Sequence, residues 1–455
     1  MAISTGDIFE GRPSGARDTK AVARRLTPGL IWALGALFLL NTMNYVDRLL
    51  FGVAQELIKK DLGLSDFQLG LPGGPAFAFL YIIAAFPIAR LAERGNRVTI
   101  ISVSFAAWSA MTALCGVATS FAQMLIGRAG VSIGEAGCAP PSHSLISDYF
   151  LPERRTTAMS VYGAAGPVGA LLAAIGGGWM AQHYGWRSTF LACGLVGVIG
   201  AAAFRLTMRE PARKPDPSRP SFFATVKLLF AKRSFVAVAA AGGVAGFASY
   251  SNHQYTVSFL MRAHGLPVSS AAVVLGLATG GIGILIMLIT GPLIEGGRKR
   301  FPGIRTWLPA VGLIWSGCVF VGAFMVNATP VAIGMLFAAS LGQHFYMPAM
   351  YTLAQDVAPP SMRATAAALM IGVISLVGYG LGPPLVGLVS DTLGQLAMVS
   401  YGTTSEACAQ ATSPACAAAT AQGLRLSLSM GSTGFILAGL LFWRSGRSIA
   451  LDMHK

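Results

Sequence analysis

Apolar stretches of about 20 residues, each long enough to cross a lipid bilayer as an α-helix, recur along the whole chain. Only 11% of the 455 residues are charged, against roughly 25% in soluble domains, so there are too few charges to cover a soluble globule of this size. The composition therefore argues against a soluble enzyme or a disordered protein and predicts an all-α membrane protein. The twelve expected spans begin near Leu30, Phe67, Val98, Phe121, Ala158, Ser188, Phe235, Ala271, Trp307, Val331, Ala364 and Leu424.

The two halves of the sequence resemble each other at an offset of 208 residues, which indicates an internal repeat. We therefore expect the twelve helices to form two pseudo-symmetric six-helix bundles. In one large class of secondary transporters, parallel six-helix repeats build a midplane site between two rocking bundles. The matched positions include Asn44 with Asn252, Glu135 with Gln343, Pro140 with Pro348, and Asp148 with Asp356.

Two long connections interrupt the pattern of spans and suggest the domain boundaries. One is rich in Pro, Arg and Lys, and the other, at 391–423, is rich in Ala, Thr and Ser. Cys408 and Cys416 share the second connection, and a disulfide between them is expected if that compartment is oxidising. The expected parts are an N-terminal segment 1–27, a first bundle 28–207, a linker 208–232, a second bundle 233–445 and a tail 446–455.

The basic residues indicate how the spans are oriented. Twelve crossings place both termini on one side of the membrane, and 26 of the 33 Lys and Arg residues fall on that side, against five on the other. By the positive-inside rule, both termini are expected in the cytoplasm. The net charge of +15 is thus a topology signal and not a nucleic-acid footprint. The short loops favour a multi-pass protein of the bacterial inner membrane.

Charged residues at membrane depth are costly, which makes them candidate functional residues. Arg128 and Glu135 share one face of span 4 but lie roughly 10 Å apart along the helix axis. That is too far for a direct pair, so we expect Asp47 and Glu135 each to lie near an arginine, Arg48 or Arg128, across the contact between spans 1 and 4. The polar stripe of span 1 has the spacing i, i+3, i+4, i+7 and consists of Asn41, Asn44, Tyr45 and Arg48.

The repeat indicates that this ionisable chemistry belongs to the first half alone. We infer that the first half binds and releases protons, with Glu135 as the first candidate and Asp47 as the second, while the second half mostly supplies substrate contacts. Burial disfavours a charged carboxylate and a nearby arginine favours it, so alternating access of water would couple protonation to conformation. A purely structural ion network is the alternative. The positions equivalent to Asp47, Arg48, Arg128 and Glu135 are Tyr255, Thr256, Leu336 and Gln343.

Two polar patches in the second half are expected to line the substrate cavity. Each contains a histidine, which is either a satisfied structural group or a proton carrier. The patches consist of Asn252, His253 and Gln254 in span 7, and of Gln343, His344 and Tyr346 in span 10.

The turn after span 2, at 93–97, resembles the loop motif of the major facilitator superfamily, in which an acid and basic residues pin neighbouring helices. Ala89 stands where that motif usually has glycine, and Glu93 where it usually has aspartate. Residues 163–169 in span 5 resemble the superfamily's antiporter motif, although simple helix packing explains their glycines equally well. The residues implied in the two copies of the loop are Glu93, Arg94, Arg97, Glu295 and Arg298.

Three segments together resemble the Spinster-type branch of this superfamily: Asn-Tyr-Val-Asp-Arg at 44–48, Arg-Ala-Gly-Val-Ser-Ile-Gly-Glu-Ala at 128–136, and Ser-Asp-Tyr-Phe at 147–150. The resemblance implies proton-coupled transport of an amphiphilic lipid of sphingolipid or lysophospholipid character. Its partners would be membrane lipids, that substrate and protons. Carried over by position, Asp47, Arg48, Arg128 and Glu135 would be the coupling and headgroup residues.

The main alternative is a proton-coupled organic-anion symporter, because a similar Asn-Tyr-x-Asp-Arg stretch occurs in anion:cation symporters. Arg48 would then bind a carboxylate, but the spans expected in the second half contain no second cationic anchor. Residues 130–134 fit G-x-S-x-G, yet a hydrolase needs that motif between a strand and a helix. An ATP-driven pump is disfavoured because the sequence contains no G-x-x-x-x-G-K-[ST] loop. We therefore expect a monomeric transporter, not an enzyme, with no cofactor, metal or nucleic-acid partner.

Overall fold

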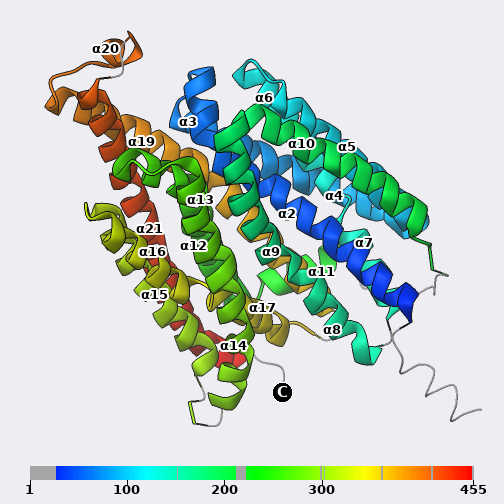
Figure 1. Cartoon of the computed structure of the whole chain (residues 1–455). Helices are drawn as coiled ribbons and strands as arrows, with labels where there is room; N and C mark the ends of the chain where they lie inside the picture. The colour runs from blue at the N-terminus through cyan, green and yellow to red at the C-terminus, as the bar shows by residue number, and fades with distance from the viewer. Residues whose placement is uncertain are drawn as a thin grey trace, which may run out of the picture.

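The computed structural model is a bundle of helices, with no strand among the residues that it describes (Figure 1). The expected N-terminal segment, most of the linker and the end of the tail lie outside those residues. The described residues are 27–150, 152–211, 222–297, 300–301, 303–359, 362–410 and 413–452.

The first half starts with α2, a helix of 35 residues with clear signals at both ends. The Thr27 side chain accepts a hydrogen bond from the backbone N–H of Leu30, and Gly63 ends the helix in the left-handed conformation at φ 63°. The helices of this half are α2 (Pro28–Leu62), α3 (Asp66–Gly73), α4 (Pro75–Arg94), α5 (Arg97–Gly116), α6 (Phe121–Glu135), α7 (Ala139–Tyr149), α8 (Pro152–Gly163), α9 (Ala165–Leu172), the π-helix η1 (Ala173–Gly177) and α10 (Gly178–Thr207).

A short helix, α11 (Phe222–Phe230), precedes the second half. The remaining elements are α12 (Arg233–His264), α13 (Val268–Gly276), η2 (Leu277–Gly281), α14 (Ile282–Gly297), α15 (Ile304–Met325), α16 (Thr329–Gln343), α17 (Tyr346–Val357), α18 (Arg363–Val373), η4 (Ile374–Tyr379), α19 (Gly380–Ser400), α20 (Ser405–Gln410) and α21 (Pro414–Asp452).

Helix boundaries reproduce the internal repeat seen in the sequence. Helices α6 and α16 both have 15 residues, and their bounds differ by the offset of 208. Each is followed by a break and a second helix, α7 or α17. Prolines stand near the start of both, at Pro140 and Pro348, where a missing N–H costs least.

Within the part of the chain that the structure describes, nine helical stretches are long and apolar enough to cross a membrane. One of them, Ala158–Thr207, has 50 residues and contains two of the expected spans, which meet at Gly185 with φ 80°. Spans 4 and 10 are absent from the nine because each is divided into two shorter helices after Glu135 and after Gln343. The twelve expected crossings therefore all have a helical counterpart.

The two halves lie side by side, with α3, α13 and α20 at one end and α8, α14 and α17 at the other (Figure 1). We call these the α3 end and the α8 end. Helix α2 packs on α12, and α3 packs on α19. The α3–α19 contact needs glycine, because a Cβ on Gly70 would lie 2.6 Å from the Cα atom of Pro384. The halves thus meet backbone to backbone at the α3 end.

Candidate substrate and proton site

The charged residues of α2 and α6 meet in the interior of the first half. Arg48 donates to the Glu135 carboxylate at 2.6 Å from Nη2 and at 3.1 Å from Nε. Asn44 Oδ1 lies 3.5 Å from the same Nη2 atom, one turn earlier on α2. The Glu135 side chain is completely buried, whereas 18% of the Arg48 side chain is exposed. The pair thus consists of a fully buried glutamate and a partly exposed arginine, which an incoming group could reach.

Asp47 and Arg128 do not form the second ion pair expected from the sequence. The Asp47 carboxylate accepts a hydrogen bond from Trp108 Nε1 on α5 at 2.9 Å, while Arg128 Nη1 donates to the backbone carbonyl of Asp47 at 3.2 Å. Each acidic residue therefore lies near an arginine of the other helix, as expected, but only Arg48 and Glu135 form an ion pair. Arg128 meets Asp47 through its backbone.

Aromatic rings surround the exposed side of Arg48. Its Cζ atom lies 4.9 Å from the ring centroid of Phe77, 5.5 Å from that of Tyr81 and 5.7 Å from that of Tyr45. Arg128 lies 5.3 Å from the centroid of Phe77. Such contacts stabilise a cation while leaving its N–H donors available.

The aromatic surface continues into the second half. Phe77 on α4 contacts Tyr379 of η4 with ring centroids 6.0 Å apart, and the Tyr379 ring lies tilted against that of Tyr250 of α12 with centroids 3.7 Å apart. The aromatic surface that begins next to Arg48 therefore extends into both bundles, so a molecule long enough to follow it would touch both.

Several polar atoms near this pair are buried without a hydrogen bond of ordinary geometry to the described residues. They are Glu135 Oε1, Asn44 Nδ2 and Arg128 Nε. A buried polar atom without a partner costs free energy, and such atoms are retained where a ligand or a proton completes them. The first half thus combines a cationic end, an aromatic wall and unfilled hydrogen-bonding capacity.

Asn41, which the sequence assigns to the same stripe, has a different environment. Its Nδ2 atom donates to the backbone carbonyl of Tyr162 on α8 at 3.1 Å, and its side chain is buried. The structure therefore places Asn41 in a helix–helix contact rather than beside Arg48.

In the second half, three residues of the two predicted polar patches line a cavity of about 30 Å³. They are Asn252, His253 and Gln343. That volume has room for little more than one or two water molecules. Asn252 exchanges hydrogen bonds with Ser432 of α21 at 3.0 and 3.2 Å. His344 lies one turn beyond Ser340 and contacts its carbonyl oxygen through Nδ1 at 2.7 Å.

The other three residues of these patches, His344, Gln254 and Tyr346, do not line the cavity. Gln254 points toward α2, where it donates to Gln55, and Gln55 Nε2 donates to the Gln254 carbonyl at 2.6 Å. Tyr346 is 3% exposed and packs in the core of the second half. Polarity in the sequence therefore identified the region but not which residues face the cavity.

Of the loop-motif residues, the structure describes the side chain of Arg97. It is 1% exposed and binds Asp148 of α7 at 2.5 Å and Glu210, just beyond α10, at 2.6 Å. Glu210 also accepts the backbone N–H of Val98 at 3.0 Å. Arg97 thus joins α5 to α7 and to the segment just after α10. The side chains of Glu93, Arg94 and Glu295, and all of Arg298, lie outside the described residues.

Sequence reasoning missed a second charged cluster at the α3 end. It contains Glu56, Lys59, Asp66 and Arg262, which join the two halves through ion pairs. From the sequence, Lys59 and Arg262 are two of the five basic residues counted on the side opposite the termini, and the structure places both in the last turns of long helices, α2 and α12. The one sequence feature that could have indicated this position is the apolar span directly before each of the two residues.

Comparisons with known proteins agree with this architecture. Residues 37–383 match the family model described as Major Facilitator Superfamily. The chain is 34% identical over 387 residues to an MFS-type efflux pump of Mycolicibacterium smegmatis, which covers 84% of this chain and 89% of that protein. It is 27% identical over 433 residues to the sphingosine-1-phosphate transporter SPNS2 of Danio rerio, which covers 89% of this chain and 83% of that protein.

Among solved structures, the chain resembles a bacterial homolog to the human lysosomal transporter Spinster, crystallised in an inward-facing and unoccupied conformation. The TM-score is 0.86 at 32% sequence identity, and the match covers 95% of this chain and all of the other.

Proposed function

This chain belongs to the major facilitator superfamily of transporters, with Spinster-type proteins among its relatives, and from that premise we propose that it is a proton-coupled carrier of an amphiphilic lipid with an anionic headgroup. The observation that carries the proposal is the Arg48–Glu135 pair, in which only the arginine is open to an incoming group.

The surroundings of Arg48 support a substrate with one charged end and a long apolar part. Arg48 supplies up to five N–H donors for a phosphate or carboxylate, and the rings of Tyr45, Phe77 and Tyr81 next to it would contact an apolar chain. Tyr379 and Tyr250 extend that surface into the second half. We infer that the headgroup binds in the first half and that both halves hold the chain.

Proton coupling follows from the charge balance of the same pair. When a headgroup takes the donors of Arg48, the sealed Glu135 carboxylate loses its main partner. A buried charge without a partner is costly, so Glu135 would take up a proton. Conversely, a proton on Glu135 frees Arg48 for the headgroup. Substrate and proton therefore favour each other's binding, as thermodynamic linkage requires.

We further propose that the α8 end faces the cytoplasm of a bacterial cell, together with both termini, because the positive-inside rule assigns 26 of the 33 Lys and Arg residues to the side of the termini. The bundles 28–207 and 233–445 would then rock against each other as a monomer, with 208–232 as their linker. In this orientation the charged cluster at the α3 end closes the outer side, which agrees with the similarity to an inward-facing structure.

The test is proton flux into vesicles that contain the purified protein. Intravesicular pH is followed while a lysophospholipid or a sphingoid-base phosphate is added to one side, with Glu135→Gln beside the wild type. We expect a lipid-dependent proton flux that the variant loses. The control is Asp61→Asn, which removes a carboxylate from a partly exposed ion pair with Arg187 and should leave the flux unchanged.

Two results would contradict the proposal. A flux in Glu135→Gln equal to that of the wild type would remove Glu135 from the coupling mechanism. A response to small carboxylates without a response to lipids would indicate an organic-anion symporter, with Arg48 as its substrate anchor.

A further inference from the structure

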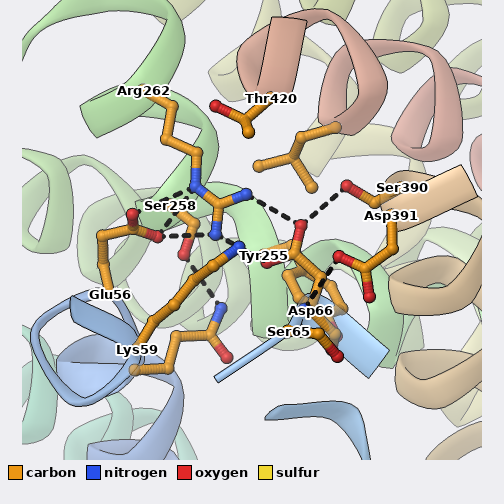
Figure 2. Close-up of polar contacts among 12 residues, drawn as sticks. Glu56, Lys59, Ser65, Asp66, Tyr255, Ser258, Arg262, Ser390, Asp391 and Thr420 are labelled. Atoms are coloured by element: carbon orange, nitrogen blue, oxygen red, sulfur yellow. Dashed lines mark hydrogen bonds and ion pairs between the residues drawn. The ribbon is translucent and has the colours of Figure 1, made fainter. Parts of the chain in front are cut away.

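Asp66, the first residue of α3, is the centre of a dense set of contacts (Figure 2). Arg262 of α12 donates to both of its carboxylate oxygens, at 2.7 and 2.8 Å. Lys59 of α2 donates at 2.5 Å and Ser390 of α19 at 2.7 Å. Asp66 is 2% exposed. A buried carboxylate with four donors is fully satisfied.

Arg262 is equally occupied. Besides Asp66, it binds the Glu56 carboxylate of α2, with Nε 2.9 Å from Oε2 and Nη2 2.8 Å from the same oxygen. Its side chain is 8% exposed. The guanidinium from the second half thus lies between two acids from the first half, as Figure 2 shows.

The backbone of α3 is also held by the second half. The first N–H groups of any helix lack partners within the helix. In α3, Ser65 and Gln68 form a capping box. The backbone N–H groups of Asp66 and Phe67 donate instead to the carboxylate of Asp391 on α19, at 3.0 and 2.8 Å. A side chain of one bundle therefore caps a helix of the other.

Tyr255 of α12 completes the arrangement. Its hydroxyl donates to the backbone carbonyl oxygen of Asp66 at 2.7 Å and lies 3.1 Å from that of Pro383. Tyr255 occupies the position in the second half that is equivalent to Asp47 in the repeat. At this position the first half has an acidic side chain, whereas the second half has a tyrosine that binds the backbone of α3.

Separation of the halves at the α3 end would break most of these contacts together. Asp66 would keep Lys59 but lose Arg262 and Ser390, and Glu56 would lose Arg262. The first turn of α3 would keep its capping box but lose Asp391 as the acceptor of two N–H groups. The ion pairs that would be lost, those of Arg262 with Glu56 and Asp66, are the ones that join the two bundles.

We propose that Asp66 is the positioning residue of a lock between the two halves: it sets how readily the α3 end opens, and the backbone N–H groups of Asp66 and Phe67 lose Asp391 as their acceptor whenever that end opens. The proposal rests on alternating access, which is part of the function proposed above, but its test does not require transport.

The experiment is hydrogen–deuterium exchange of the purified protein in lipid nanodiscs without added substrate, read at the peptide that contains the Asp66 and Phe67 amides. The variant Arg262→Gln leaves Asp391, the acceptor of those two N–H groups, in place. We expect exchange there to rise at least about tenfold, because loss of the arginine opens the lock. Asp66→Asn should have a similar effect, and Ser390→Ala a smaller one.

The matched control is Asp61→Asn. Its ion pair with Arg187 lies at the same end of the molecule but within the first half, so exchange at α3 should stay at the wild-type rate. Arg262→Lys should recover part of the protection, because it keeps the charge but loses the two-pronged contact.

Two outcomes would overturn the lock. One is unchanged protection of the α3 amides in both Arg262→Gln and Ser390→Ala. The other is an equal rise in exchange in α5, which would indicate general loosening of the fold. Absence of lipid-dependent proton flux in the wild type would contradict the proposed function and leave the exchange result standing.

Discussion

The molecule contains two buried charged clusters that differ in how completely they are satisfied. At Arg48 and Glu135 a single ion pair lies within one half, the nearby Arg128 Nε atom is buried without a hydrogen bond to the described residues, and the arginine is partly open. At Asp66 and Arg262 every carboxylate oxygen and the guanidinium are occupied, and the contacts cross between halves. The first arrangement suits a site that exchanges partners, and the second suits a contact that holds a conformation.

The largest effect that this comparison predicts is for Arg48→Ala. The change removes the headgroup donor and the partner of Glu135 together, so lipid-dependent transport in vesicles should fall at least about 100-fold, the loss expected for a charged hydrogen-bonding pair worth about 3 kcal/mol. Arg48→Lys should recover only part of the rate, because a lysine cannot replace the planar fork. Transport by Arg48→Ala within a factor of two of the wild type would show that the open pair is not the binding site.

A smaller effect is expected for Gly70→Ala, which disturbs the saturated cluster without touching a charge. The new Cβ would lie 2.6 Å from the Cα atom of Pro384, and backbone on both sides leaves little room to adjust. Such overpacking costs about 1–3 kcal/mol. Here it should destabilise the conformation in which the α3 end is closed.

The measurement is hydrogen exchange at α3, with Gly35→Ala as the control, because a Cβ at Gly35 meets nothing within 4 Å. We expect faster exchange in Gly70→Ala alone. Equal exchange in the two variants would mean that close packing of α3 on α19 does not contribute to closure.

The smallest effect is expected for Trp108→Phe, which tests whether the open cluster depends on its supporting contacts. The ring stack on Phe105 is kept, but the buried Asp47 carboxylate loses a donor. Loss of a buried hydrogen bond to a charged group costs about 1–3 kcal/mol, so the melting temperature should fall by several degrees while transport changes only a few-fold.

Trp186→Phe is the paired control. Trp186 also donates to an aspartate, Asp61, at 3.3 Å, but Asp61 is partly exposed and water can replace the donor. An equal loss of melting temperature in the two variants would contradict the importance of burial at Asp47.

Much of the fold could be predicted from the sequence, because spans and repeats are local patterns. The apolar stretches predicted the crossings, and the offset of 208 predicted the matching bounds of α6 and α16. The Arg48–Glu135 pair was predicted as well, since few partners are available to a charge at membrane depth.

The lock could not be predicted, because its partners are brought together only by packing. Asp66 and Arg262 are 196 residues apart in the chain, and each follows or ends an apolar span where a charge is expected in any case. The same limit applies to Gln254, whose polarity gave no indication that it faces α2 rather than the cavity. Helical periodicity identifies a face of a helix but not the helix that it meets.

The disulfide between Cys408 and Cys416 bears on how the whole molecule is oriented in the membrane. It lies in the connection around α20, at the same end as α3 (Figure 1). Disulfides persist on the oxidising side of a membrane and are reduced in the cytosol. A disulfide at the α3 end therefore supports the proposed orientation, in which that end faces away from the cytoplasm, independently of any count of basic residues.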